Sequence, residues 1–284
     1  IRLSSHLLSG VDECDAADGV MLARAGTSIQ ELTRVAADAG WVWPMDTLSE
    51  AGTLGGALAT GIEGPRRLGF GAARDNVLGI ETTLATGERT HCGARVVKNV
   101  TGYDMAKLYI GSFGSLAVIE GAWIRLKPKA ESVNSMALSL EENEESFRLA
   151  IAASRRISTR AGALLSESLA SLCPELGPQP KRGAPWRLMV ECGGDEVVTR
   201  HDSEWLSEKA TSQTVSSEAM DALGGLQQFP QAEGLRVRLH LLPSGLETAC
   251  RELREAGLGV LAYPEPTTVY AFFCADSDSD PDWL

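Results

Sequence analysis

The sequence lacks the close cysteine and histidine spacings that mark most protein metal sites. Its 6 cysteines are widely spread and form no CxxC pair, so neither a zinc nor an iron–sulfur centre is indicated. Its 4 histidines stand apart, without an HxH or HxxxH pair. The acidic stretches at 141–145 and 276–282 are more typical of a solvated helix start and a tail than of a calcium loop. We therefore predict no metal site.

Long apolar runs and clustered basic charge are missing as well. No run approaches the ~20 apolar residues of a membrane helix, so we do not expect the chain to span a membrane. The net charge of -12 disfavours nucleic acid as a partner. Scattered cysteines without a signal peptide predict reduced thiols and a cytoplasmic protein.

Common nucleotide-binding and hydrolase motifs are also absent. There is no GxxxxGK[ST] and no GxSxG. The nearest approach to a dinucleotide fingerprint is "GFGAAR", Gly69 to Arg74. It lacks the third glycine and no helix pattern follows at once, which argues against a Rossmann domain.

What the sequence does contain predicts an α+β protein of two domains. With 284 residues, 44% hydrophobic and 23% charged, the chain is long enough for two cores. In the first half we expect a strand at 19–26, a helix at 27–40 and two strands around a turn at Thr86–Gly87. A short helix capped by Asp104 and a strand at 115–126 follow. We place the domain boundary near residue 130, giving domains 1–130 and 131–284.

The second domain is expected to be an antiparallel sheet covered by helices. Its predicted strands are "SVNSMALSL", "WRLMVECGG", "GLRVRLHLLP" and two around the turn of "GVLAYPEPTTVYAFF". Its predicted helices are "EENEESFRLAIAASRRIS", "DEVVTRHDSEWLSEKA" and "SGLETACRELREAG".

Residues 50–79, "EAGTLGGALATGIEGPRRLGFGAARDNVLG", form the most unusual segment, with 8 glycines in 30 residues. No acid, base or nucleophile is arranged among them in a recognisable way. Glycines without side chains let a backbone approach an anion or a flat ring closely, and Arg66, Arg67 and Arg74 add local basic charge. On composition alone, a flexible or tightly turned loop is an equal alternative.

The order of the surrounding segments resembles the FAD-binding domain of the vanillyl-alcohol oxidase type. The segments are "RAGTSIQEL", "WPMD", "GTLGGALATG", "FGAARDNVLG", "KNVTGYDMAKLYIGSFGSLAVI" and "RLKP". D-lactate dehydrogenases and glycolate oxidase flavin subunits carry the same succession, and the match covers residues 1 to 130. "EGPRR" (63–67) and "KNVTGYD" (98–104) are most similar to the E subunit, the smaller flavin subunit, of bacterial glycolate oxidase.

The resemblance implies an extended, non-covalently bound FAD, contacted largely by main-chain atoms. His91 and Cys92 do not fall at the positions where some relatives attach FAD covalently. The family's first subdomain, with a glycine loop of the "RGGGT" kind, is expected before Ile1, so the FAD-binding domain is incomplete here and a cap domain follows it. The residues that the resemblance places at the cofactor are Pro44, Asp46, Thr53, Leu54, Gly55, Gly56, Thr60, Gly61, Gly71 and Ile119.

No catalytic base follows from the resemblance. Relatives that oxidise 2-hydroxy acids unaided carry histidine-rich metal motifs in the cap, and neither His201 nor His240 forms such a motif. Lys98 and Tyr103 are polar residues near the expected flavin side, and a structural role for both is favoured.

The implied function is that of a FAD-dependent oxidoreductase acting on CH–OH donors, as a subunit that oxidises a small 2-hydroxy acid such as glycolate. A second flavin subunit and an iron–sulfur subunit would be its partners, and any contact with the inner membrane would be made through them. One alternative is an assembly or scaffold subunit that keeps the fold without flavin. A self-sufficient oxidase of an alcohol or sugar acid ranks last, because it needs a base.

Overall fold

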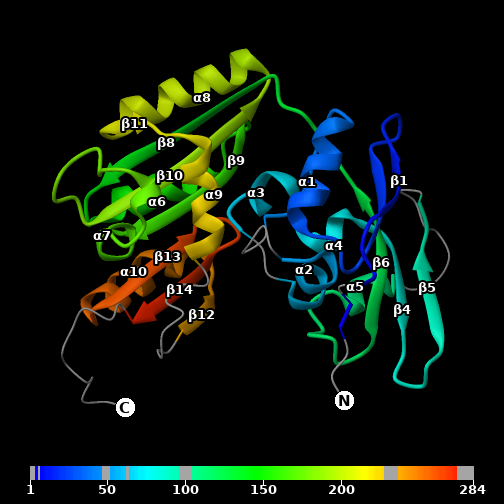
Figure 1. The fold of residues 1–284 in the computed structure, drawn as a ribbon. Helices are drawn as coiled ribbons and strands as arrows, with labels where there is room; N and C mark the ends of the chain where they lie inside the picture. Colours follow the sequence, from blue (N-terminus) through cyan, green and yellow to red (C-terminus); the bar gives the residue numbers. More distant parts are fainter. Residues whose placement is uncertain are drawn as a thin grey trace. The chain divides into compact units, whose positions relative to one another are not determined.

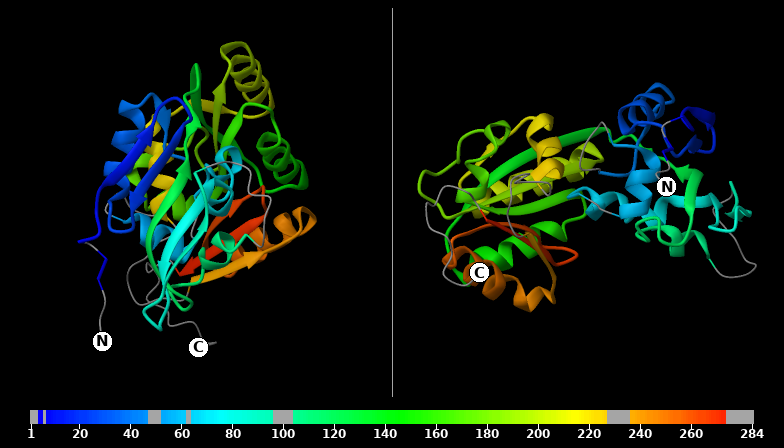
Figure 2. Two further views of the ribbon diagram at one scale, coloured as in Figure 1. Left: turned by 90° about the vertical axis from the view of Figure 1, so that its right-hand side faces the viewer. Right: turned by 60° about the horizontal axis from the view of Figure 1, so that its bottom comes forward.

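The computed structural model describes residues 4–5, 7–46, 52–61, 64–95, 104–226 and 236–273. The chain divides into two compact units, Ile1–Lys129 and Ala130–Leu284 (Figure 1), which we call the first and the second unit. The course of the chain through each can be followed from two further sides in Figure 2.

The first unit is built on a five-stranded antiparallel sheet with the strand order β1-β2-β6-β4-β5. A two-stranded ladder, β3 with β7, lies outside this sheet. The strands are β1 (Val11–Asp15), β2 (Val20–Arg24), β3 (Trp41–Val42), β4 (Val77–Thr83), β5 (Arg89–Gly93), β6 (Val118–Arg125) and β7 (Lys127–Pro128).

Helix α1 (Ile29–Asp38) covers the core of this unit, as its 3.6-residue periodicity predicts. Ser28 caps it by accepting a hydrogen bond from the Glu31 amide, and Leu32 and Ala36 are fully buried. The remaining helices of the unit are short: α2 (Leu54–Thr60), α3 (Arg67–Phe70), α4 (Ala73–Asn76) and α5 (Ala106–Tyr109).

The glycine-rich stretch therefore differs from the single loop that its composition allowed, because its described part contains α2, α3 and α4. Thr53 caps α2 by accepting from the Gly56 amide, and Gly61 ends the helix in the left-handed conformation at φ 59°. Leu54 and Leu58 are fully buried, and their burial outweighs the helix penalty of the glycines. The expected cap of α5 is also wrong: Met105, not Asp104, is the N-cap residue.

The second unit contains a seven-stranded antiparallel sheet with the order β11-β8-β10-β9-β13-β14-β12. The strands are β8 (Ser132–Leu140), β9 (Thr159–Ser166), β10 (Trp186–Gly194), β11 (Ser212–Thr214), β12 (Arg236–His240), β13 (Leu258–Tyr263) and β14 (Thr268–Phe273). The helices are α6 (Glu144–Ser154), α7 (Glu167–Ala170), η1 (Pro174–Leu176), α8 (Glu196–Lys209), α9 (Ser217–Leu226), η2 (Pro243–Gly245) and α10 (Leu246–Glu255).

Both faces of this sheet are covered. Leu188 of β10 packs in one core cluster with side chains of α6, α8 and α10. The next residue, Met189, packs in the other cluster, with side chains of α7, η1 and α9. An α+β chain with an antiparallel second sheet is the expected fold class, and it is confirmed. Strand β9 was missed because "TRAGALLS" is buried on both faces and shows no alternation.

None of the helices in the described ranges has the length and apolar character that crossing a bilayer requires.

Candidate functional site

A cavity of about 520 Å³ in the first unit brings several of the predicted cofactor residues together. Helix α2 contributes Gly55, Gly56 and Ala59 to its wall, and β6 contributes Val118, Ile119 and Glu120. The rest of the lining comes from the N-terminal segment, the end of β4 and the turn before β6: Ser4, Ser5, Leu8, Thr83, Gly114 and Ala117. Gly55 and Gly56, although far in sequence from Ile119, thus face the same space as Ile119.

Backbone hydrogen bonds explain why α2 lies beside β6. The Ala25 amide donates to the carbonyl of Glu120 at 2.8 Å, and the Ala25 carbonyl accepts from the Gly55 amide at 2.7 Å. The Leu54 amide donates to the Thr27 carbonyl at 3.0 Å. The turn between β2 and α1 therefore holds the start of α2 against the start of β6.

The two adjacent glycines of α2 serve different purposes. A Cβ at Gly55 would lie 2.9 Å from the Cβ of Ala25 and 3.1 Å from its carbonyl oxygen, so no side chain fits there. A Cβ at Gly56 would meet only the Thr53 hydroxyl, at 3.3 Å, before the open space of the cavity. Gly55 is thus required by packing within the protein, whereas Gly56 leaves room inside the cavity.

The first amides of α2 are already bound within the protein. The Leu54 and Gly55 amides donate to backbone carbonyls, and the Gly56 amide donates to the Thr53 hydroxyl at 3.2 Å. A ligand in the cavity therefore meets the Cα surface of the glycines rather than free N–H donors. This arrangement suits a ring or a sugar better than a phosphate.

The other predicted cofactor residues do not line this cavity. The Asp46 carboxylate accepts from the Arg66 amide at 2.5 Å and pairs with its guanidinium at 3.5 Å, and Gly64 packs directly against Asp46. The Thr60 hydroxyl donates to the Gly56 carbonyl at 2.8 Å. Pro44, Thr53, Leu54 and Gly61 lie in neighbouring segments, and Gly71, with φ 82°, joins α3 to α4.

Arg66, which the sequence suggested as local basic charge, is thus engaged by Asp46 and does not line the cavity. Lys98 and Tyr103 lie outside the described residues.

Glu120 is the charged residue among the described residues of the cavity wall, and sequence reasoning missed it. Thr83 Oγ1 donates to its Oε1, and Arg89 Nε lies 3.4 Å from the same oxygen. No Lys or Arg is among the lining residues that the structure describes. A glutamate within the apolar strand "SLAVIEGAW" was the available signal, because charged residues inside a strand are rarely placed without a partner.

The cavity wall fits the uncharged parts of FAD. Leu8, Ala117 and Val118 offer apolar surface to a ring, while Thr83 and Glu120 offer polar groups to hydroxyls. The diphosphate finds no cation among the described lining residues. The residues present therefore fit a flavin with its ribityl chain or an adenosine, with the diphosphate outside this cavity.

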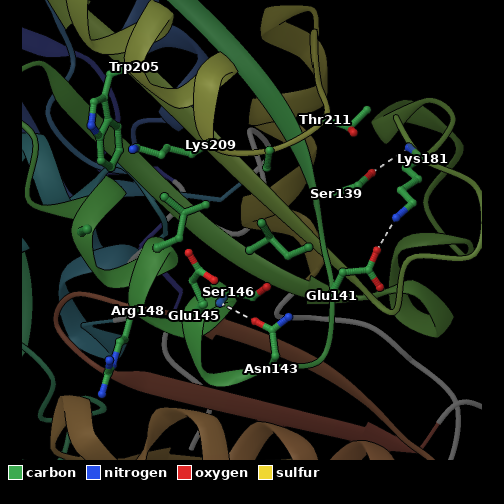
Figure 3. Close-up of a pocket in the computed structure, with 14 residues that line it drawn as sticks. Ser139, Glu141, Asn143, Glu145, Ser146, Arg148, Lys181, Trp205, Lys209 and Thr211 are labelled. Atoms are coloured by element: carbon green, nitrogen blue, oxygen red, sulfur yellow. Dashed lines mark hydrogen bonds and ion pairs between the residues drawn. The ribbon is translucent and has the colours of Figure 1, made fainter.

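A second cleft, of about 510 Å³, lies in the second unit between the end of β8, α6 and the end of α8 (Figure 3). Several of its charged side chains already contact other protein groups. Lys181 forms an ion pair with Glu141, and the ammonium of Lys209 lies 5.8 Å from the ring centre of Trp205. The Asn143 side chain caps α6 by accepting from the Ser146 amide. We therefore place the candidate site in the first unit.

Comparison with known proteins agrees with that placement. Residues 1–93 match the family described as "FAD binding domain". The chain is 30% identical over 216 residues to the mitochondrial D-2-hydroxyglutarate dehydrogenase of Rattus norvegicus, covering 73% of this chain and 39% of that protein. It is 34% identical over 137 residues to the glycolate oxidase subunit GlcE of Escherichia coli (strain K12), covering 47% of this chain and 39% of that subunit.

Among solved structures, the fold is similar to that of an alkyldihydroxyacetonephosphate synthase. The TM-score is 0.65 at 14% identity, and the match covers 93% of this chain and 58% of that one. The match to each of the two curated relatives spans 39% of that relative's own length. The expected resemblance is thereby confirmed at the level of the domain: the first unit carries an FAD-binding domain of the vanillyl-alcohol oxidase and D-lactate dehydrogenase type.

Proposed function

We propose that the chain binds FAD non-covalently, with one part of the cofactor in the cavity between α2 and β6. The observation that carries this proposal is that Gly55 and Gly56 line one space with Ile119, which is far from them in sequence, in a unit whose residues 1–93 match an FAD-binding family. Gly56 leaves room for the cofactor, and the backbone of Ile119 borders it from the strand. Pro44, Asp46, Thr60, Gly61 and Gly71 act one step away, by holding the segments around α2 and α3 in place.

We further propose that the protein acts in the oxidation of a small 2-hydroxy acid. Bound FAD supplies the two-electron redox chemistry, which the side chains themselves cannot supply. Support for the substrate class comes from the relatives, one named a D-2-hydroxyglutarate dehydrogenase and another a glycolate oxidase subunit. A subunit role, with a second flavin subunit and an iron–sulfur subunit as partners, is the finer form of this proposal. It rests on the "EGPRR" and "KNVTGYD" segments.

One observation favours the alternative of a scaffold subunit without flavin. The amides at the start of α2 are taken by protein acceptors, and the described cavity wall carries no cation for a diphosphate. A scaffold would keep the fold and the partner contacts and would have no need of either feature.

The near-ultraviolet and visible absorption spectrum, recorded during titration with FAD, separates the two candidates. We expect a flavin spectrum that copurifies with the protein or a perturbed flavin spectrum that saturates on titration. Absence of any saturable change would overturn the FAD proposal and leave the scaffold. Copurification of an iron–sulfur protein in the same preparation would support the subunit role in either case.

A further inference from the structure

Strand β6 contains an irregularity at Glu120 that regular pairing with β4 would not produce. Glu81 pairs with Gly121 and Thr82 pairs with Ile119, so Glu120 lies opposite no residue of β4. One extra residue in a strand is a β-bulge, and bulges redirect the side chains they carry. Because of the bulge, the Glu120 side chain does not follow the regular alternation of side chains between the two faces of the sheet. It lies at the wall of the cavity.

The carboxylate is fixed on one side and available on the other. Oε1 accepts from the Thr83 hydroxyl and lies 3.4 Å from Nε of Arg89. The Glu120 side chain is 18% exposed, whereas Arg89 is 81% exposed and therefore a weak ionic partner. Oε2 has no protein partner among the residues that the structure describes. A half-buried carboxylate oxygen without a protein donor is suited to accept hydrogen bonds from a ligand.

The chemistry of the wall restricts what that ligand group can be. An ionised carboxylate only accepts hydrogen bonds, and a pair of neighbouring hydroxyls offers it two donors. A phosphate would instead place like charges together in a cavity whose described lining has no Lys or Arg. Acidic residues bind the ribose hydroxyls of dinucleotides in other folds by the same logic.

We propose that Glu120 accepts hydrogen bonds from neighbouring hydroxyl groups of the cofactor and keeps its diphosphate out of the cavity, thereby setting the direction in which FAD lies. This inference rests on the proposed function. FAD has two sources of such hydroxyls, the ribose of its adenosine and the ribityl chain of its flavin. The bulge, the Oε2 without a partner among the described residues, and the lack of Lys or Arg in the described lining apply to both.

Affinity measurements with three ligands test the proposal and distinguish the two sources. FAD contains both hydroxyl sources, FMN only the ribityl chain, and ADP only the adenosine ribose. Binding of each is measured by calorimetry for the full protein, for Glu120→Ala and for Glu120→Gln. Glu81→Ala is the matched control, because Glu81 is a half-buried carboxylate of the same sheet that pairs with Arg24 at 2.7 Å and does not line the cavity.

We expect Glu120→Ala to weaken FAD binding about tenfold or more, the loss expected for a charge-assisted hydrogen bond. A parallel loss for ADP alone assigns the adenosine ribose, and a parallel loss for FMN alone assigns the ribityl chain. Glu120→Gln keeps the shape and one acceptor, so it should lose less, and Glu81→Ala should bind as the unaltered protein does.

Equal FAD affinity of the Glu120 variants and the unaltered protein would overturn the role of Glu120 and leave the proposed function intact. Absence of FAD binding by the unaltered protein would overturn both. Thermal unfolding of each variant is measured in parallel, and a loss of affinity for all three ligands together with a lowered unfolding temperature would assign Glu120 a purely structural role.

Discussion

Gly56→Leu is expected to weaken FAD binding by roughly 10- to 100-fold while leaving the protein folded. The side chain would extend into the cavity, and overfilling a close-fitting space costs about 1–3 kcal/mol. Gly56 lies within α2, where leucine is a better helix former than glycine by roughly 0.5–1 kcal/mol. Titration with FAD and unfolding in urea measure the two effects separately.

The adjacent glycine provides the matched control. Gly55→Ala places a methyl group 2.9 Å from the Cβ of Ala25, and we expect it to lower the free energy of unfolding by about 1–3 kcal/mol. Gly56→Ala should have an intermediate effect on binding and little on stability. If Gly56→Leu bound FAD as tightly as the unaltered protein, the cofactor would not occupy this cavity.

Asp202→Ala is expected to produce a large loss of stability in the second unit, about 3 kcal/mol. Asp202 is 2% exposed and accepts hydrogen bonds from Arg156 Nε at 2.8 Å and from the amide and hydroxyl of Ser158 at 3.1 and 2.7 Å. Removing the carboxylate leaves a buried amide and a half-buried guanidinium without their acceptor. Urea unfolding measures the loss. Glu204→Ala, an exposed carboxylate of the same helix, should change stability little.

The contribution of Asp202 to the free energy of unfolding should decrease in acid. Burial raises the pKa of Asp202, but the hydrogen bonds from Ser158 and the charge of Arg156 outweigh it and hold the pKa below the ordinary value of 3.8. A carboxyl whose pKa is lower in the folded state stabilises the protein above its ordinary pKa. That contribution is lost as the pH falls below 3.8 through the folded-state value. The stability difference between the unaltered protein and Asp202→Ala should therefore shrink in acid, and a constant difference would contradict the assignment.

Local patterns sufficed for most strands and for helices α1, α5, α6, α8 and α10, whereas tertiary packing decided the rest. The periodicity of α1 and its Ser28 cap are visible in the sequence and are found in the structure. Composition alone misled for residues 50–79, because the burial of Leu54 and Leu58 is a tertiary property that no local propensity contains.

In the candidate site, too, the sequence indicated some features, whereas others depend on tertiary packing. The resemblance indicated Gly55, Gly56 and Ile119, which line one cavity. It could not show that the neighbouring amides of α2 are bound within the protein, since their acceptors belong to Ala25 and Thr27. Nor could it reveal Glu120, whose direction depends on a bulge relative to β4. Strand pairing and hydrogen-bond partners depend on residues far apart in the sequence, so a local sequence motif does not specify them.

Hydrogen exchange of the full protein, with and without saturating FAD, would locate the cofactor directly. We predict slower exchange in α2 and at the start of β6 when FAD is present, because a bound cofactor stabilises both walls of the cavity. Exchange around the cleft of the second unit, at 139–149 and 205–211, should not change. Protection confined to that cleft, with α2 and β6 unaffected, would contradict the placement of FAD in the first unit.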